Sequence, residues 1–119
     1  MQKFKFSYDR ENDDLFLYNP KSKSKRSVEI GDLVLDYNSK KELVGIQILN
    51  ASKFIKDFVD VKGSSIKDIL NNLEECKVDV KAKSNMLIIK IYLHAKEKDL
   101  SPVISVPRIV EKSPALASA

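Results

Sequence analysis

The 119-residue sequence has no tryptophan, one cysteine, one histidine and three glycines. A single cysteine, Cys76, excludes a disulfide bond within the chain and a metal site built on paired thiolates, which fits the reducing cytosol. The glycines stand apart from one another, so there is no glycine-rich phosphate-binding loop. No apolar run is long enough for a signal peptide or a membrane-spanning helix. We therefore predict a cytoplasmic protein.

Charged residues are abundant and nearly balanced, with 21 Lys and Arg against 17 Asp and Glu. The surplus of cations is small and spread along the chain, so it suits solubility as well as a polyanionic partner. Abundant Lys and Glu with two glutamines are also typical of thermophilic proteins. The length predicts one domain, which we assign to residues 1–112, with 113–119 as a flexible tail.

Hydrophobic patterning in the first half predicts antiparallel strands. Residues 4–8 alternate aromatic and polar side chains, the period of two that lays one face of a strand on a core. The acidic run 9–14 predicts a turn, with Asn12 at a position of positive φ. The strand predicted at 15–18 is apolar on both faces, so it is either covered on both sides or lies against another subunit. Three more strands are predicted at 27–30, 33–37 and 43–49.

Two short helices are predicted next. Apolar residues recur at helical spacing over 51–59, with Asn50 as the N-cap. A second helix is predicted to begin at Ser65, in an imperfect capping box with Asp68, and to bury Leu73 on its apolar side.

The register of a following hairpin can be predicted from the sequence. If Ser84 and Asn85 form a two-residue turn, Cys76 pairs with Leu93 on one wholly apolar face. A slip of one residue would turn this apolar set to water, so the register is strongly specified. Two prolines bracket residues 103–106, which predicts a final edge strand.

Together these elements predict an α+β fold, with antiparallel β-meanders and two short helices packed on one sheet face. The first part of the domain is a module at 4–56. The second part, at 60–110, holds a helix, the hairpin and the edge strand.

Three segments in register resemble a known family: Tyr8-Asp-Arg-Glu-Asn-Asp-Asp-Leu15, Gly31-Asp-Leu-Val-Leu-Asp-Tyr37 and Leu43-Val-Gly-Ile-Gln-Ile-Leu-Asn-Ala-Ser52. Their order and spacing over 4–56 resemble the prokaryotic domain-of-unknown-function family numbered 2283. The resemblance implies a type of module and no established activity. The chain departs from the family pattern at Gln47, where the family has Glu, and at Lys41, where the family commonly has Gly.

Few residues suggest chemistry. Alternate carboxylates at Asp9, Glu11 and Asp13 begin like a calcium-binding EF-hand loop, but the required Gly and closing Glu are absent. We interpret this run as a charged turn. His94 has no second histidine or candidate nucleophile beside it in the sequence, and Cys76 falls on the predicted core face, where burial raises a thiol pKa. We therefore predict no catalytic residue, no metal, no cofactor and no enzyme, although an undiscovered hydrolase stays a third alternative.

The leading functional prediction rests on Phe16 and Tyr18, which make up the second apolar face of the 15–18 strand. Exposed apolar strand surface invites pairing with another chain. We predict a non-catalytic protein-interaction module, acting as a homodimer or on an unidentified protein, with these two residues as the contact.

Nucleic-acid binding, as a regulatory or antitoxin-like accessory protein, is the alternative. A basic loop and the polar face of the hairpin would neutralise phosphates, and one aromatic ring would stack on a base. The candidate contact residues are Lys21, Lys23, Lys25, Arg26, Lys77, Lys81, Lys83, Lys90 and Tyr92. We expect no membrane partner.

Overall fold

The computed structural model describes residues 1–61 and 63–108. These residues form mostly antiparallel sheet with two short helices, and the predicted tail at 113–119 lies outside them. In chain order the elements are β1 (Gln2–Asp9), β2 (Asp14–Tyr18), β3 (Arg26–Ile30), β4 (Leu33–Tyr37), β5 (Leu43–Ile48), α1 (Ala51–Lys56), α2 (Gly63–Asn71), β6 (Leu73–Lys83), β7 (Met86–Ala95), β8 (Asp99–Leu100) and β9 (Val103–Pro107).

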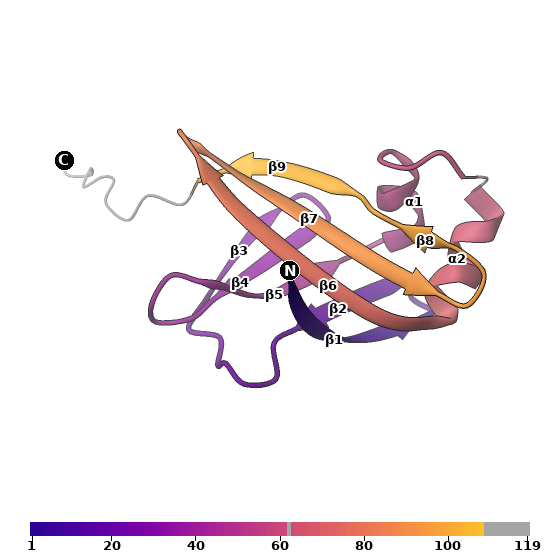
Figure 1. The fold of residues 1–119 in the computed structure, drawn as a ribbon, viewed down its shortest axis with the longest axis horizontal. Helices are drawn as coiled ribbons and strands as arrows, with labels where there is room; N and C mark the ends of the chain where they lie inside the picture. The colour runs from indigo at the N-terminus through magenta and orange to yellow at the C-terminus, as the bar shows by residue number, and fades with distance from the viewer. Residues whose placement is uncertain (62, 109–119) are drawn as a thin grey trace.

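The strands form one continuous sheet that β1 divides into two halves. The order is β3-β4-β5-β2-β1-β6-β7-β8, and β9 also pairs with β7. Residues 2–4 of β1 pair with β6, whereas residues 5–9 pair with β2. We call β3-β4-β5-β2-β1 the N-terminal half and β6-β7-β8-β9 the hairpin half. In Figure 1 the hairpin half crosses in front of the N-terminal half.

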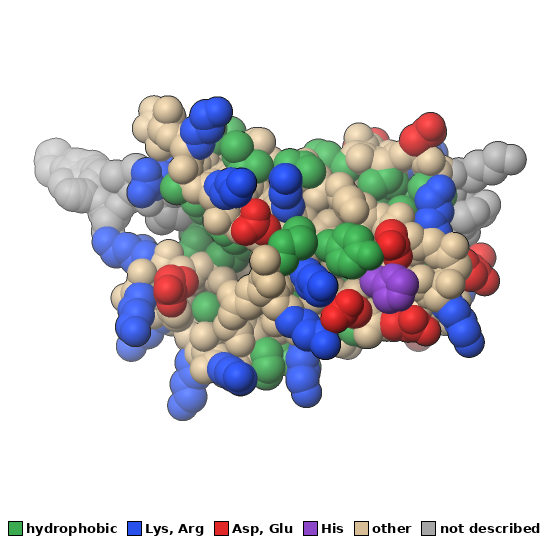
Figure 2. All heavy atoms as spheres, viewed as in Figure 1, with side chains coloured by type: hydrophobic (Ala, Val, Ile, Leu, Met, Phe, Trp, Pro, Cys, Tyr) green, Lys and Arg blue, Asp and Glu red, His purple; other side chains and the backbone are tan. Residues whose placement is uncertain are grey.

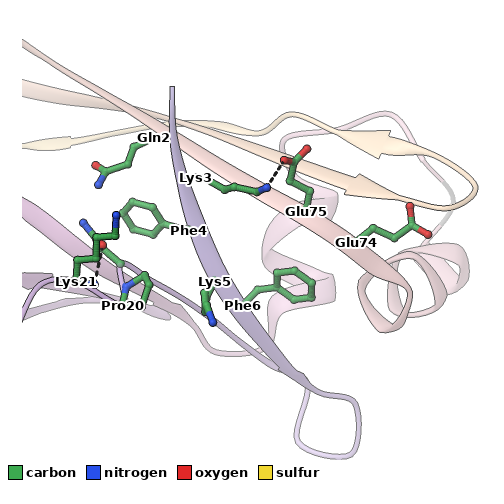
Figure 3. A pocket seen from close by; sticks show the side chains of 10 residues that line it. Gln2, Lys3, Phe4, Lys5, Phe6, Pro20, Lys21, Glu74 and Glu75 are labelled. Carbon is green, nitrogen blue, oxygen red and sulfur yellow. Dashed lines mark hydrogen bonds and ion pairs between the residues drawn. The ribbon is translucent and has the colours of Figure 1, made fainter.

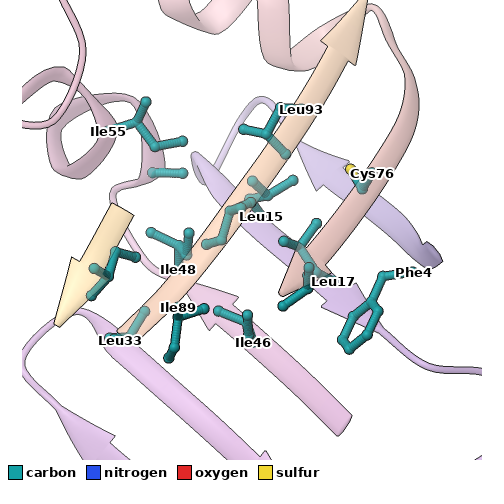
Figure 4. Close-up of a cluster of buried hydrophobic side chains, with 14 of the residues drawn as sticks. Phe4, Leu15, Leu17, Leu33, Ile46, Ile48, Ile55, Cys76, Ile89 and Leu93 are labelled. Atoms are coloured by element: carbon teal, nitrogen blue, oxygen red, sulfur yellow. The ribbon is translucent and has the colours of Figure 1, made fainter. Parts of the chain in front are cut away.

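The core lies between the two halves, because each turns its apolar face toward the other. Leu15 and Ile46 of the N-terminal half and Ile89 and Leu93 of the hairpin half are completely buried. Figure 4 shows these side chains converging in the space between the strands. Full burial stabilises a side chain of this size by roughly 1.5 to 3 kcal/mol. The core therefore depends on strands from both ends of the chain.

The two helices were predicted to pack on one face of the sheet. Figure 1 shows that they lie at one end of it. Ile55 of α1 and Ile66 and Leu70 of α2 are buried in the same core as the strands. The two sheet halves already cover most of each other's apolar surface. The helices therefore close the end of the core, and the fold is richer in sheet than a balanced α+β arrangement.

Several helix boundaries differ from the prediction. The first helix ends at Lys56, not at residue 59. The second begins at Gly63, so Ser65 lies inside the helix and is not its N-cap. Leu73 is the first residue of β6 and pairs with Ala95. Periodicity could not separate the end of this helix from the start of the strand, because one apolar residue fits both patterns.

The predicted hairpin register is confirmed. Cys76 pairs with Leu93, and every pair between them and the turn follows the predicted sequence. The inner face is buried near Cys76 but not at the tip, where Val80 is 38% exposed. The hairpin therefore extends beyond the core. The predicted last strand is also confirmed, since β9 pairs with the outer edge of β7.

Candidate interaction surface

Phe16 and Tyr18 lie side by side on the outer face of the N-terminal half, which is the face turned away from the core. Their rings stack with centroids 5.1 Å apart and an interplanar angle of 26°. Phe16 is 37% exposed, whereas its neighbours Leu15 and Leu17 are fully buried. A strand that is apolar on both faces is either covered by other parts of the chain or lies against another subunit. The exposure of Phe16 excludes cover by the described residues.

The strand register arranges the outer face in rows. One row runs from Lys5 on β1 through Tyr18 and Gly45 to Asp36 on β4. Directly paired residues of antiparallel strands point to the same side, so this row places an ammonium at one end and a carboxylate at the other. Three strand spacings separate these ends, a distance on the order of 14 Å. The aromatic pair lies between the two charges.

A shallow hollow of 340 Å³ opens beside the aromatic pair, with Phe16, Tyr18, Asp36 and Val44 among its lining residues. Val44 is the extra residue of a β-bulge, because the pairing of β4 with β5 shifts there. Gly45 is required next to it. A Cβ atom at Gly45 would lie 2.7 Å from Oδ2 of Asp36.

The acidic turn after β1 contains a buried carboxylate, Asp13, where the sequence pattern predicts only a charged turn. Asp13 has a φ of 56°, so the left-handed position predicted for Asn12 falls one residue later. Its carboxylate accepts hydrogen bonds from the Tyr8 hydroxyl at 2.7 Å and from the Ser52 hydroxyl at 2.7 Å. The backbone N–H of Ser52 also donates to it, at 3.1 Å to Oδ1.

This carboxylate caps α1. Asn50 occupies the predicted N-cap position, but its side chain makes no capping hydrogen bond. Instead Asp13 supplies its carboxylate to Ser52 and its backbone carbonyl to the N–H of Ala51, at 2.8 Å. The pairing was not predictable from local spacing, because Asp13 and Ser52 are 39 positions apart. The sequence signal for this contact was that both residues lie in the segments that resemble the family.

Four candidate basic residues that follow β2 are all exposed: Lys21, Lys23 and Lys25 in the loop, and Arg26, which was predicted in the loop but is the first residue of β3. Backbone hydrogen bonds fix this loop at both ends, from Asn19 to Val44 at 2.8 Å and from Lys25 to Tyr37 at 2.7 Å. The loop therefore presents its cations from a defined backbone.

The outer face of the hairpin half carries the other candidate cations, and its aromatic ring has partners. Tyr92 donates a hydrogen bond to Asp99 at 2.7 Å, and Nζ of Lys77 lies 5.9 Å from the ring centroid. Nδ1 of His94 lies 2.6 Å from the same Asp99 carboxylate. Figure 2 shows this histidine among acidic side chains on the surface. The hydrogen bond to Asp99 raises the pKa of His94 above its ordinary value.

Lys81, Lys83 and Lys90 are exposed further along this half, with Lys81 and Lys83 near the hairpin tip. The structure thus divides the nine candidate nucleic-acid residues between a loop of the N-terminal half and the outer face of the hairpin half.

Another hollow, of 670 Å³, lies where β1 exchanges one partner strand for the other. Phe4 and Phe6 of β1 line this hollow, and Figure 3 shows them with Lys21 and Glu74, which line it as well. Lys3 crosses this hollow to form a 3.1 Å ion pair with Glu75. Its charged groups are of both signs, so the hollow does not select a ligand of one charge.

Cys76 is buried, and burial raises the pKa of its thiol to about 12. The direction of this shift agrees with the sequence prediction. Within residues 1–61 and 63–108 no cluster of three or more His, Cys, Asp or Glu side chains is placed to hold a metal ion. None of the described helices is long and apolar enough to cross a membrane.

These features define a small two-layer antiparallel β protein with an aromatic outer surface. A family model described as a protein of unknown function (DUF2283) matches residues 5–52. An uncharacterized protein of Methanocaldococcus jannaschii is 35% identical over 100 residues, which cover 82% of this chain and 80% of that protein. The chain belongs to this family of unknown function, as the three segments predicted.

A second relative, from Methanosarcina mazei, is provisionally named as a hypoxanthine phosphoribosyltransferase. It is 26% identical over 96 residues, which cover 79% of this chain and 72% of that protein. No solved structure matches the chain significantly.

Proposed function

We propose that this protein is a non-catalytic interaction module that forms a homodimer through the outer face of its N-terminal half. The observation that carries the proposal is the stacked pair of Phe16 and Tyr18, with Phe16 37% exposed on a sheet face whose opposite side is the core. Exposed aromatic residues beside a hollow are typical anchors of protein interfaces.

A second copy of the chain is the occupant that the charges favour. A two-fold axis that runs parallel to the strands, above the outer face and between Tyr18 and Gly45, would pack two outer faces together and reverse the row that contains these residues. Lys5 of each copy would then face Asp36 of the other, and the two aromatic pairs would meet near the axis. Such a surface is complementary to itself, as an isologous dimer requires.

Light scattering tests the dimer. We expect the wild-type protein to have twice the mass of the 13.5 kDa chain. Phe16→Lys should give a folded monomer, because it places a charge at the buried centre of the interface. Phe58→Lys is the matched control, since Phe58 is 42% exposed but follows α1 and lies off this face. A wild-type monomer at high micromolar concentration would reject the proposal.

Charge reversal tests the orientation. Lys5→Asp and Asp36→Lys should each weaken the dimer, because each brings like charges together across the axis. The double variant should restore it, whereas Lys53→Asp, on the exposed side of α1, should have no effect. Failure of the double variant to recover would exclude this axis even if a dimer exists.

Nucleic-acid binding is a second candidate function, which the exposure of the four basic residues that follow β2 favours. If the loop makes three or four phosphate contacts to duplex DNA, log affinity should fall with log salt at a slope of about −3 to −4. Replacing all four residues by Ser should flatten the slope. No measurable binding at 50 mM salt would remove this candidate. The name of the Methanosarcina mazei relative, at 26% identity, adds no activity to the proposal.

A further inference from the structure

A third hollow, of 380 Å³, opens between the β6–β7 hairpin and the turn that joins β4 to β5. Its apolar lining includes Phe4, Leu43, Val78 and Leu87. This volume lies within the range of roughly 300 to 1,000 Å³ that is usual for small-molecule pockets. The hollow shares no residue with the row from Lys5 to Asp36, so it is independent of the proposed dimer surface.

Tyr37 lines this hollow and carries an unsatisfied polar group. Its side chain is 4% exposed, and its hydroxyl is buried without a hydrogen-bond partner among the described residues. Buried hydroxyl groups nearly always have a partner, because an unmade hydrogen bond loses the favourable interaction with water. Burial also raises the pKa of Tyr37, so the phenol stays protonated and can donate.

We propose that this hollow binds a small neutral molecule with an apolar body and one carbonyl- or ether-type oxygen, which accepts the hydrogen bond of the Tyr37 hydroxyl. The apolar walls favour the body of such a ligand. The charged residues on the lining are Lys41, Glu42 and Asp79, which carry no excess of positive charge to attract an anion. Because the hydroxyl is shielded in the empty protein, binding includes a small outward shift of flexible lining side chains, such as the exposed Met1.

A neutral fluorescent ketone, 6-propionyl-2-(dimethylamino)naphthalene, is a suitable probe, because its emission shifts to the blue in apolar surroundings. We expect saturable binding to the wild-type protein. Tyr37→Phe should weaken the affinity about 3- to 10-fold, since it removes one hydrogen bond and keeps the ring. Phe58→Leu is the control and should bind as the wild type does, because Phe58 is exposed and lines neither this hollow nor the outer-face hollow. Leu87→Trp should fill the hollow and abolish binding.

Thermal unfolding without the probe is a second measurement. It distinguishes an unsatisfied Tyr37 hydroxyl from one that has a hydrogen-bond partner within the protein. Tyr37→Phe should keep or raise the Tm, because it removes an unsatisfied buried group. A lower Tm would mean that the protein itself satisfies the hydroxyl, and would overturn the proposal. Equal affinity in Tyr37→Phe, or no saturable binding to the wild type, would also overturn it. Binding should persist in Phe16→Lys, which excludes the outer-face hollow as the source.

Discussion

The carboxylate of Asp13 accepts hydrogen bonds from both the hydroxyl and the backbone N–H of Ser52, and so joins the turn after β1 to the first turn of α1. Both residues lie in the segments that resemble the family. These hydrogen bonds are made within the chain. Part of the family pattern therefore specifies the contact that holds the turn after β1 against α1.

Asp13→Ala should lower the free energy of unfolding by roughly 2 to 4 kcal/mol, since it leaves the buried donors of Ser52 and the partly buried hydroxyl of Tyr8 without an acceptor. Asp13→Asn should cost less, because its amide oxygen still accepts from Ser52 and asparagine tolerates the left-handed backbone. Urea denaturation of the three proteins measures the difference. Equal stability of Asp13→Ala and the wild type would show that the junction contributes little.

The same residue predicts a pH dependence. Burial raises the pKa of Asp13, but hydrogen bonds from Tyr8 and Ser52 outweigh burial and hold the pKa below its ordinary value of 3.8. The folded-state pKa is therefore depressed, and the stabilisation is present above pH 3.8 and lost as the pH falls through the lower, folded pKa. Between pH 5 and pH 3 the stability gap between wild type and Asp13→Asn should narrow only below about pH 4. A constant gap down to pH 2 would contradict this assignment.

The hairpin register predicts unequal costs for two neighbouring isoleucines. Ile89 is fully buried between the sheet halves, whereas Ile88 lies on the outer face and is half-buried. Ile89→Ala should cost about 2 to 5 kcal/mol, because it leaves a cavity, and Ile88→Ala should cost much less. Chemical denaturation measures both. Similar large losses would show that the outer face of the hairpin is also covered.

Two glycines should differ in why they resist substitution. Gly31 has a φ of +59° with open space around it, so Gly31→Ala should cost about 1 to 2 kcal/mol from backbone strain. Gly45→Ala should instead suffer a clash with Asp36. Replacing Asp36 by Ala as well should recover part of that loss, since the two sites are in contact. Additive losses in the Gly45 and Asp36 double variant would argue against the clash.

The pKa of His94 should respond chiefly to one carboxylate. The hydrogen bond to Asp99 is the main cause that raises this pKa above 6.5, and Glu74 contributes less. Asp99→Asn should therefore lower the His94 pKa more than Glu74→Gln does, as NMR titration of the imidazole protons can measure. Because the folded pKa is raised, any stabilisation from this pair is present below pH 6.5 and lost as the pH rises through the folded pKa. An unchanged pKa in Asp99→Asn would refute this pairing.

The hairpin register was predictable because a two-residue turn and an alternating pattern fix every pair from Cys76 to Leu93. The capping role of Asp13 was not predictable in the same way, since it depends on the fold that brings Ser52 to it. The place of the helices was also beyond local patterns, because burial of Ile55 and Ile66 specifies a core and not which strands supply it.

The candidate surface shows the same division. The apolar pattern on both sides of β2 indicated that Phe16 and Tyr18 are unusual, and the structure places them on the outer face. The hollow at Tyr37 gave no sequence signal, because a tyrosine with an unsatisfied hydroxyl has the same pattern as any buried tyrosine.

Because β1 pairs with a strand of each half, the family-like segment cannot bury its apolar face when it is separated from the hairpin half. Residues 5–52, which the family model matches, supply the strands of the N-terminal half and none of the hairpin half. Separated from β6 and β7, this segment would expose the face that carries Leu15, Leu17 and Ile46 to water. Any protein that contains such a segment must therefore provide a second apolar layer, either from its own downstream sequence or from another chain.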